Sequence, residues 1–275
     1  MQAINAHTKH KCRAISYKRT WLQYPYDILN PAEQELKQWL KWADVLNLHD
    51  EIDYGNVGKP IVATYHGSWY RERWETVNRR DKALHAVQTC LTADLSLYGP
   101  RWIGRAMPDM TASWHPAEEF TVVHSPTQPH RKGTDLVRKA CQKLGLKLDV
   151  ITKLTHTECL KRKAKGHVLV DQVGPRALGY GTSAVEAWAL GMPVISGAPK
   201  EVQRQYLNLA GCVPFVTVAD VGQIVTALVL CQERDSVYKK VQERGRQFWL
   251  KHHSPQAVAL KFIEACNDAR KVKNV

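Results

Sequence analysis

The fold is decided by the stretch Leu178-Gly-Tyr-Gly-Thr-Ser-Ala-Val-Glu-Ala-Trp-Ala-Leu-Gly-Met-Pro-Val-Ile195. A strand is predicted to end near Asp171, and a loop containing Gly179 and Gly181 follows it. A helix then begins near Ser183 and ends at the glycine of Leu-Gly-Met-Pro. Glycines let a ligand approach the backbone, and a helix N-terminus offers free N–H groups, so the stretch suits a phosphate. A tight strand–helix connection without a ligand has the same spacing, so both interpretations stay open.

Outward from this stretch, short apolar runs rich in β-branched residues alternate with segments of helical spacing. The predicted strands are 120–124, 148–151, 167–171, 194–196 and 214–218, and the predicted helices are 133–144, 155–163, 183–190 and 219–231. Such alternation implies parallel β-α-β units. The second part of the chain is therefore predicted to be a Rossmann-like α/β layer sandwich.

The first part is less regular but shows the same alternation. Strands are predicted at 45–48, 61–65 and 86–91, and a helix at Gln2–Lys9. Asn30 and Pro31 suit the N-cap and first position of a second helix that runs to about Trp42.

Turn residues between Pro108 and Pro116 interrupt the pattern and predict a domain boundary there. We expect a reduced first domain over 1–112 and a second domain over 113–252. The stretch 235–271 is predicted to form two helices split at Ser254-Pro255, with 253–275 as a separate C-terminal helix.

The composition is ordinary except for its charge. The 275 residues carry a formal net charge of +13, and residues 121–275 hold 24 basic against 12 acidic side chains. A basic surface attracts polyanions such as nucleic acid, anionic membranes or phosphorylated small molecules. Solubility alone is the simpler explanation of the same surplus.

The seven cysteines are widely spaced and include no Cys-x-x-Cys, which argues against a disulfide framework or a zinc ribbon. Reduced thiols in the cytoplasm, or in a host cytoplasm if the protein is viral, are the expectation. No apolar run reaches the roughly 18 residues of a membrane span. The polar start lacks the apolar core of a secretory signal, so no transmembrane segment is expected.

The central stretch resembles the motif of retaining GT-B glycosyltransferases of family 4. Gly179-Tyr180-Gly181 matches the glycine loop, and Glu186-Ala-Trp-Ala-Leu-Gly-Met-Pro-Val-Ile195 matches the remainder. Upstream, His124–Thr134 resembles the loop of that family in which a Lys-Gly pair supplies a lysine to the donor diphosphate. The segments His167–Gln172, Ala43–His49 and Tyr65-His66-Gly67-Ser68 resemble further strands and a His-Gly loop. The resemblance implies an α/β GT-B fold, with two Rossmann-like domains facing a cleft, the N-terminal one reduced and the C-terminal helices crossing back.

The resemblance also implies a site and an activity. The enzyme would move a sugar from a nucleoside-diphosphate sugar, expected to be UDP-linked, to an acceptor with retention of configuration. The diphosphate would be bound by Lys132, a second cation (Arg131 or Arg176) and the backbone near Gly181, Thr182 and Ser183. Glu186 would bind the ribose, and His66 would be the catalytic residue, hydrogen-bonding the sugar or assisting a proton movement. No aspartates are spaced i, i+2, so we expect no metal and no cofactor beyond the donor.

Simpler roles stand beside each of these residues. Lys132 would also suit a solvated turn, Glu186 an exposed helix position, and His66 a satisfied strand end. Two departures from the family also matter. Leu178 replaces the first glutamate of the motif, and the chain begins with a helix where the family has a strand and a glycine-rich loop.

The acceptor is suggested by aromatic and cationic residues that alternate after His66. Trp69 and Arg71, with Arg73 and Trp74 beyond them, suit stacking on a sugar or a base. A phage-type enzyme that glycosylates a modified base in DNA would explain the basic surplus, after flipping the base. A glycan or lipid-linked acceptor at an anionic membrane surface fits equally. A non-catalytic nucleotide-binding relative and a nucleic-acid-binding protein on a Rossmann-like scaffold are the other two hypotheses.

Overall fold

The computed structural model describes residues 1–17, 25–50, 58–233 and 236–273. The chain forms two compact units. The first contains Met1–Arg19, Pro25–Ala106 and Pro255–Val275, and the second contains Met107–Ser254. The units therefore divide at residues 106 and 107, ahead of the boundary expected at 112. The last helix belongs to the first unit instead of standing alone, so the chain does cross back.

The second unit is built on a five-stranded sheet in the order β11-β10-β9-β7-β8. Every pair of neighbouring strands in it is parallel. The strands are β7 (Thr121–His124), β8 (Lys147–Val150), β9 (Val168–Val170), β10 (Val194–Ser196) and β11 (Val216–Thr217). The predicted α/β alternation is confirmed, with strand ends within two residues of those expected.

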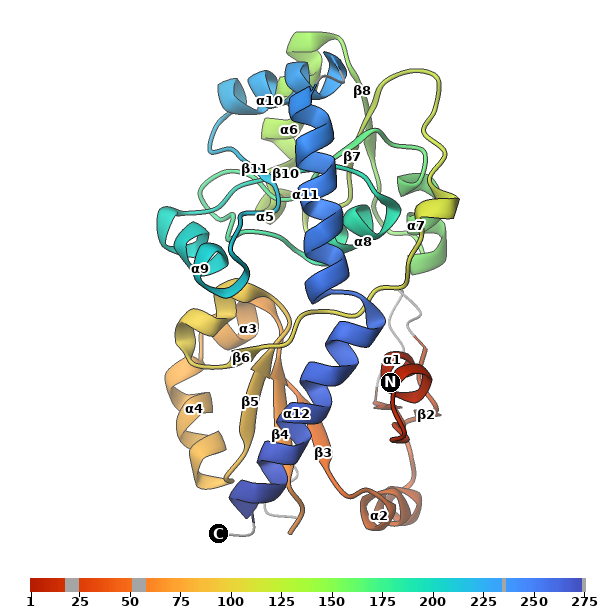
Figure 1. The fold of residues 1–275 in the computed structure, drawn as a ribbon, viewed down its shortest axis with the longest axis vertical. Helices are drawn as coiled ribbons and strands as arrows, with labels where there is room; N and C mark the ends of the chain where they lie inside the picture. Colours follow the sequence, from red (N-terminus) through yellow and green to blue (C-terminus); the bar gives the residue numbers. More distant parts are fainter. Residues whose placement is uncertain (18–24, 51–57, 234–235, 274–275) are drawn as a thin grey trace. The chain divides into compact units, whose positions relative to one another are not determined.

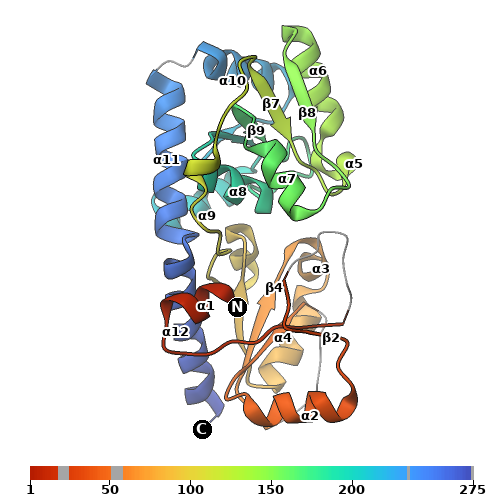
Figure 2. The same ribbon diagram turned by 90° about the vertical axis from the view of Figure 1, so that its right-hand side faces the viewer.

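Helices cover both faces of this sheet, with α6 and α11 on opposite sides (Figure 2). The helices are α5 (Pro129–Lys132), α6 (Thr134–Leu144), α7 (His156–Lys163), α8 (Thr182–Leu190), α9 (Lys200–Ala210), α10 (Val221–Glu233) and α11 (Ser236–His252), with a 3₁₀ turn η2 at Thr111–Ser113. Alternate strand residues explain the layers. Val122, Val168, Val170 and Ile195 pack with α6 and α10, which leaves Leu169 and Val194 for the other face.

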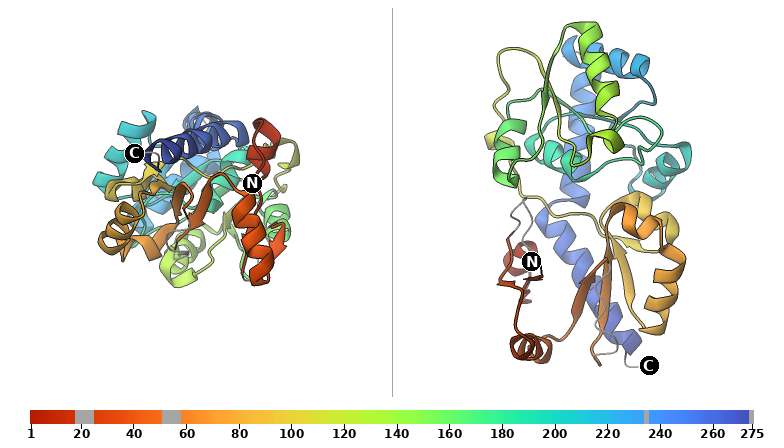
Figure 3. Two further views of the ribbon diagram at one scale, coloured as in Figure 1. Left: turned by 90° about the horizontal axis from the view of Figure 1, so that it is seen from below. Right: turned by 180° about the vertical axis from the view of Figure 1, so that it is seen from behind.

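The first unit has a four-stranded sheet in the order β3-β4-β5-β6, and each neighbouring pair is parallel. Its strands are β3 (Leu46–His49), β4 (Ile61–Tyr65), β5 (Val87–Cys90) and β6 (Arg101–Trp102), and a separate short pair joins β1 (Ile15–Ser16) to β2 (Ile28–Leu29). The helices are α1 (Gln2–His7), α2 (Glu33–Trp42), α3 (Gly67–Arg71), α4 (Trp74–Ala83), the 3₁₀ helix η1 (Ala93–Tyr98) and α12 (Pro255–Lys273). Helix α12 runs across one face of the sheet (Figure 1), and α4 lies on the other (Figure 3, left).

The start of α2 was predicted wrongly. The helix begins at Glu33 with Ala32 as its N-cap, and Pro31 lies outside it. Asn30 adopts a φ of 48° and its N–H donates to the Ser16 carbonyl at 2.7 Å. The backbone of Asn30 therefore extends the β1–β2 pair, and this pairing overrides the local preference for an N-cap.

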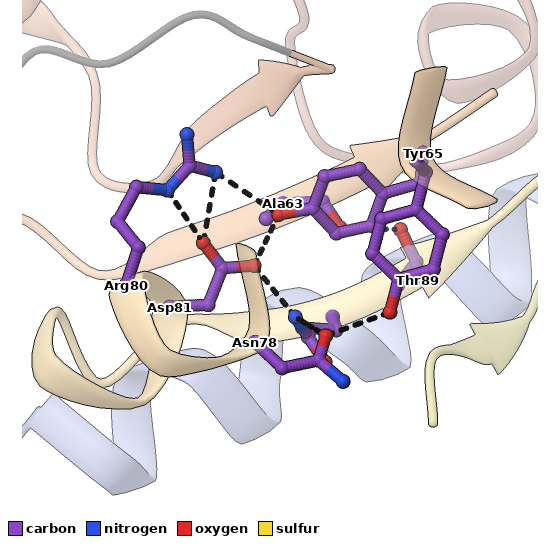
Figure 4. Close-up of polar contacts among 8 residues, drawn as sticks. Ala63, Tyr65, Asn78, Arg80, Asp81 and Thr89 are labelled. Atoms are coloured by element: carbon purple, nitrogen blue, oxygen red, sulfur yellow. Dashed lines mark hydrogen bonds and ion pairs between the residues drawn. The ribbon is translucent and has the colours of Figure 1, made fainter. Parts of the chain in front are cut away.

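A buried polar network fastens α4 to its sheet (Figure 4). The Tyr65 hydroxyl donates to Asp81, which is 2% exposed, and Gln88 donates to the same carboxylate at 2.8 Å. Arg80 donates to the other oxygen of Asp81 through Nε and Nη2. Because every oxygen of this buried carboxylate is used, the network serves to hold the helix in place.

Candidate functional site

The loop between β9 and α8 lies at the carboxyl edge of the second sheet. The side chain of Asp171, which follows β9, accepts a hydrogen bond from the Gly181 N–H. Gln172 donates to the Gly179 carbonyl at 2.8 Å, and the Ser196 hydroxyl donates to the same carbonyl. These bonds fix both glycines of the loop ahead of α8, so Asp171 has a structural role in this loop.

Gly179 occupies a position that only glycine fits. Its φ is 97°, and a Cβ there would collide with the Tyr206 hydroxyl. Tyr180 beside it is 1% exposed, and its hydroxyl hydrogen-bonds His253 at 2.9 Å. The side chain of Tyr180 thus packs the loop from inside and does not face a ligand.

Lys132, at the end of α5, reaches the loop that contains Gly179 and Gly181. Its ammonium group donates to the Gln172 side chain at 2.9 Å. A Cβ built on Gly181 would lie 3.2 Å from the Lys132 nitrogen and 3.4 Å from an Asp171 oxygen. The structure therefore brings Lys132 and Gly181 together, although 49 positions separate them in the sequence.

The N-terminus of α8 provides uncharged hydrogen-bond donors, the backbone amides of its first turn. Gly181 is the N-cap, with no side-chain cap, and Thr182 and Ser183 form the first turn. Amides in a first turn have no carbonyl partner within the helix, and they lie at the positive end of its dipole. In the described part of the chain, neither Arg131 nor Arg176 forms an ion pair. The amides of this first turn and the ammonium group of Lys132 together suit an anion, whereas no contact among the described residues places Arg131 or Arg176 beside them.

Glu186 lies one turn into α8 and is 4% exposed. One carboxylate oxygen accepts a hydrogen bond from Lys163, and the other bonds His156 at 2.9 Å. Lys163 is fully buried and also donates to the Ser183 hydroxyl at 2.8 Å. Glu186 is therefore not an exposed helix glutamate. Its role toward a ribose stays a prediction.

The electrostatics of this cluster keep both groups charged. Burial by itself would raise the pKa of Glu186, but Lys163 and His156 more than offset it and hold the pKa below its ordinary value. Burial would lower the pKa of Lys163, yet the Glu186 carboxylate raises it above the ordinary value. The two residues therefore form a buried ion pair beside the first turn of α8.

Neither Lys163 nor His156 was predicted from the sequence. Lys163 belongs to a Lys-Arg-Lys run, a pattern typical of solvent-exposed helix faces. Its spacing could have predicted its burial, since Cys159 and Leu160 precede it by four and three residues and share its inward helix face.

His66 lies in the first unit, directly after β4, and is the N-cap of α3. Its Nε2 and the Nδ1 of His49 are 2.7 Å apart. The pKa of His66 is lowered to about 3, by burial first and then by the positive charge of Arg105. His66 is thus a neutral imidazole, and its partner His49 was not predicted from the sequence.

Trp69 and Arg71 are both on α3, and each has a partner inside the first unit. Arg71 donates through Nε and Nη2 to Asp94, which is 2% exposed. The guanidinium of Arg73 lies over the Trp69 ring, 5.6 Å from its centroid. Arg71 therefore has a structural task, and acceptor binding by these two residues stays a prediction.

The described residues offer neither a cluster of metal ligands nor a membrane-spanning helix. His, Cys, Asp and Glu side chains nowhere gather in a group of three that would hold a metal ion. No helix among the described residues is both long and apolar enough to cross a membrane.

Comparison with known proteins identifies the fold. No family model and no curated protein sequence matches the chain. Among solved structures, a glycosyltransferase from Rickettsia africae ESF-5 aligns with a TM-score of 0.62 and 11% identity, over 86% of this chain and 79% of that chain. Sucrose-phosphate synthase from Thermosynechococcus elongatus gives 0.59 and 14%, over 86% and 77%. The chain has the GT-B fold.

A third similar structure is an alpha-glucosyltransferase in complex with UDP and a 13-mer DNA containing a HMU base. It aligns with a TM-score of 0.57 and 12% identity, over 88% of this chain and 85% of that chain. The GT-B fold expected from the resemblance is thus confirmed. At such identities the likeness concerns the fold, and the function must be argued from the residues.

Proposed function

We propose that the protein is a glycosyltransferase that moves a sugar from a nucleoside-diphosphate sugar, UDP-linked in our expectation, to an acceptor. The observation that carries this proposal is the meeting of Lys132 with Gly181 and the first turn of α8. Breaking a glycosidic bond to a nucleoside diphosphate places charge on the leaving group, and preorganised cations and amides stabilise such charge. The GT-B fold supports the same function.

In this proposal each group of the second unit has a task. The ammonium of Lys132 and the guanidinium of Arg131 or Arg176 bind the phosphate oxygens, together with the amides of Thr182 and Ser183. The Glu186 carboxylate accepts hydrogen bonds from the ribose. The cations take the place of a metal ion, so the proposed reaction is metal-independent. It retains configuration, as in the family that the sequence motif resembles.

Nucleotide binding tests the donor site directly. UDP should raise the melting temperature, and Lys132→Ala should weaken UDP binding by roughly 10- to 100-fold, since a hydrogen bond to a charged group contributes about 1.5–3 kcal/mol. Glu186→Ala should weaken UDP binding but not inorganic diphosphate binding. Lys139→Ala removes an exposed lysine from α6 and is the matched control. No response to any nucleoside diphosphate would eliminate the proposed donor site.

DNA carrying a modified base is the acceptor class that we propose. Two observations favour it: the basic surplus of residues 121–275, and the DNA present in one of the similar structures. DNA binding should weaken steeply with salt. Mass spectrometry of hydroxymethylated DNA after incubation with UDP-sugars would show transfer, whereas transfer only to glycans would redirect the proposal to a glycan or lipid-linked acceptor.

A non-catalytic nucleotide-binding relative is the second candidate function, and Leu178 is the observation that favours it. The side chain at this position is apolar where the resembled motif has a glutamate. Nucleotide binding without donor hydrolysis or transfer would support this candidate.

All seven cysteines are free, which supports a cytoplasmic location for either function.

A further inference from the structure

Four polar side chains share one face of the sheet in the first unit. Asn47 and His49 alternate with Leu46 and Leu48 along β3, so the polar pair points away from the apolar pair. His49 is paired in register with Thr64 of β4, and Thr64 is paired with Thr89 of β5. The two threonines are at most 1% exposed, so the buried end of this polar row is anchored in the sheet.

These side chains form a continuous series of hydrogen bonds that ends at His66. The Thr64 hydroxyl donates to Asn47 Oδ1 at 2.7 Å. Asn47 Nδ2 lies 2.9 Å from His49 Nε2, and His49 Nδ1 lies 2.7 Å from His66 Nε2. Among the described residues, no side chain bonds the remaining ring nitrogen of His66.

The direction of the series follows from the chemistry of neutral imidazole, which has one donor nitrogen and one acceptor nitrogen. Asn47 presents its amide N–H to His49, so Nε2 of His49 accepts and Nδ1 carries the proton. His49 then donates to Nε2 of His66, and the proton of His66 must be on Nδ1. Both rings are neutral, because each uses the lone pair of one ring nitrogen to accept a bond in this series. Burial and then the charge of Arg105 also lower the pKa of His66.

We propose that Asn47 and His49 are positioning residues that lock His66 into the Nδ1–H tautomer, so that it acts toward substrate as a hydrogen-bond donor. This inference rests on the proposed transferase function, because the partner of the donor is an oxygen of the reacting substrates. The lone pair of His66 is already used by His49, so His66 does not accept a proton from an acceptor hydroxyl. Of the two His66 N–H groups, the backbone one donates to Asp50 at 2.8 Å, which leaves the ring N–H for the proposed bond to substrate.

The test reverses the direction of the series without removing a bond. In Asn47→Asp, carboxylate oxygens replace the amide donor, so His49 must protonate Nε2 and accept at Nδ1. His66 must then donate from Nε2 and leave Nδ1 unprotonated. The full-length protein, labelled with ¹⁵N in its histidine rings, is compared at pH 8 by long-range ¹H–¹⁵N NMR. His66→Gln identifies the signal by its loss.

The wild-type spectrum should show His66 protonated at Nδ1, and Asn47→Asp should show it protonated at Nε2. Asn208→Asp adds the same charge at an exposed position of α9 and should leave the tautomer unchanged. A wild-type His66 protonated at Nε2, or an Asn47→Asp spectrum identical to wild type, overturns the assignment. The NMR measurement needs no turnover, so it decides the tautomer of His66 even if the protein is not a glycosyltransferase.

Turnover then tests the donor role. With UDP-glucose as donor and water as acceptor, Asn47→Asp should lower kcat roughly tenfold or more with little change in KM, because a hydrogen bond made to the reacting groups is lost. Asn208→Asp should leave both constants unchanged. A reversed tautomer with unchanged kcat would overturn the role of His66 as a donor.

Discussion

Replacing Lys163 by methionine should destabilise the protein by about 3–5 kcal/mol, the range observed when one partner of a buried ion pair is removed. The Lys163 side chain is fully buried, and its ammonium bonds the Glu186 carboxylate and the Ser183 hydroxyl. Methionine fills a similar volume, so little of the loss would come from a cavity. What remains is a buried carboxylate whose other partner, among the residues that the structure describes, is His156.

Urea denaturation measures the loss, and a second substitution separates charge from packing. Glu186→Gln in the Lys163→Met background removes the uncompensated carboxylate, so the double variant should recover at least about 2 kcal/mol relative to the sum of the single ones. In a melting experiment, 3–5 kcal/mol corresponds to roughly 6–20 °C for a unit of this size. Lys161→Met changes an exposed lysine of the same helix and should shift stability by less than about 0.5 kcal/mol.

Either a small loss of stability or additive losses would contradict the buried ion pair. A loss below about 1 kcal/mol in Lys163→Met would mean that water or a neighbouring group already solvates the carboxylate. Additive losses in the double variant would mean that the lysine and the glutamate stabilise the unit through separate contacts.

Three further results are expected. Glu186 has a pKa below its ordinary value of 4.5, so its stabilising effect is fully present above that pH and lost as the pH falls below it. The difference in urea midpoint between wild type and Lys163→Met should therefore narrow from pH 7 to pH 3, and a constant difference would contradict the ion pair. Gly179→Ala should lower the free energy of unfolding by more than Gly211→Ala, because both glycines have positive φ but only at Gly179 would a Cβ collide with a neighbour. Thr155→Ala should cost about 1 kcal/mol in urea denaturation, since it removes the capping box of α7, and an unchanged midpoint would show that the cap is unimportant.

The sheet of the second unit was predictable because the residues that end its helices and strands act locally. Gly191 ends α8 in the left-handed region, and short β-branched runs between such stops have one sensible interpretation as buried strands. The start of α2 failed for the opposite reason. Asn30 and Pro31 satisfy a local rule, but the partner that decided the outcome, Ser16, is distant in sequence. Local chemistry contains no information about such a pairing.

The site divides in the same way. Lys132 and Glu186 were identified because they belong to a motif of fixed spacing. Lys163 and His49 were missed because their roles depend on a second side chain brought near by the fold. A lysine is almost never fully buried without a partner, so its sequence context favoured the surface. The groups that orient a functional residue are therefore the ones that sequence reasoning finds last.

The buried ion pair bears directly on what Glu186 does. A glutamate removed from water without a cation would raise its pKa and take up a proton, and it would then present a donor. With Lys163 beside it, Glu186 stays ionised and is an acceptor only, which is the state that ribose hydroxyls require. Each carboxylate oxygen accepts about two hydrogen bonds, and Lys163 and His156 use one on each. One acceptor direction per oxygen remains, and we propose that it is the ribose of the donor that uses them. An apolar pair would stabilise the helix packing at least as well, but it would offer no acceptor to the ribose of the proposed donor site.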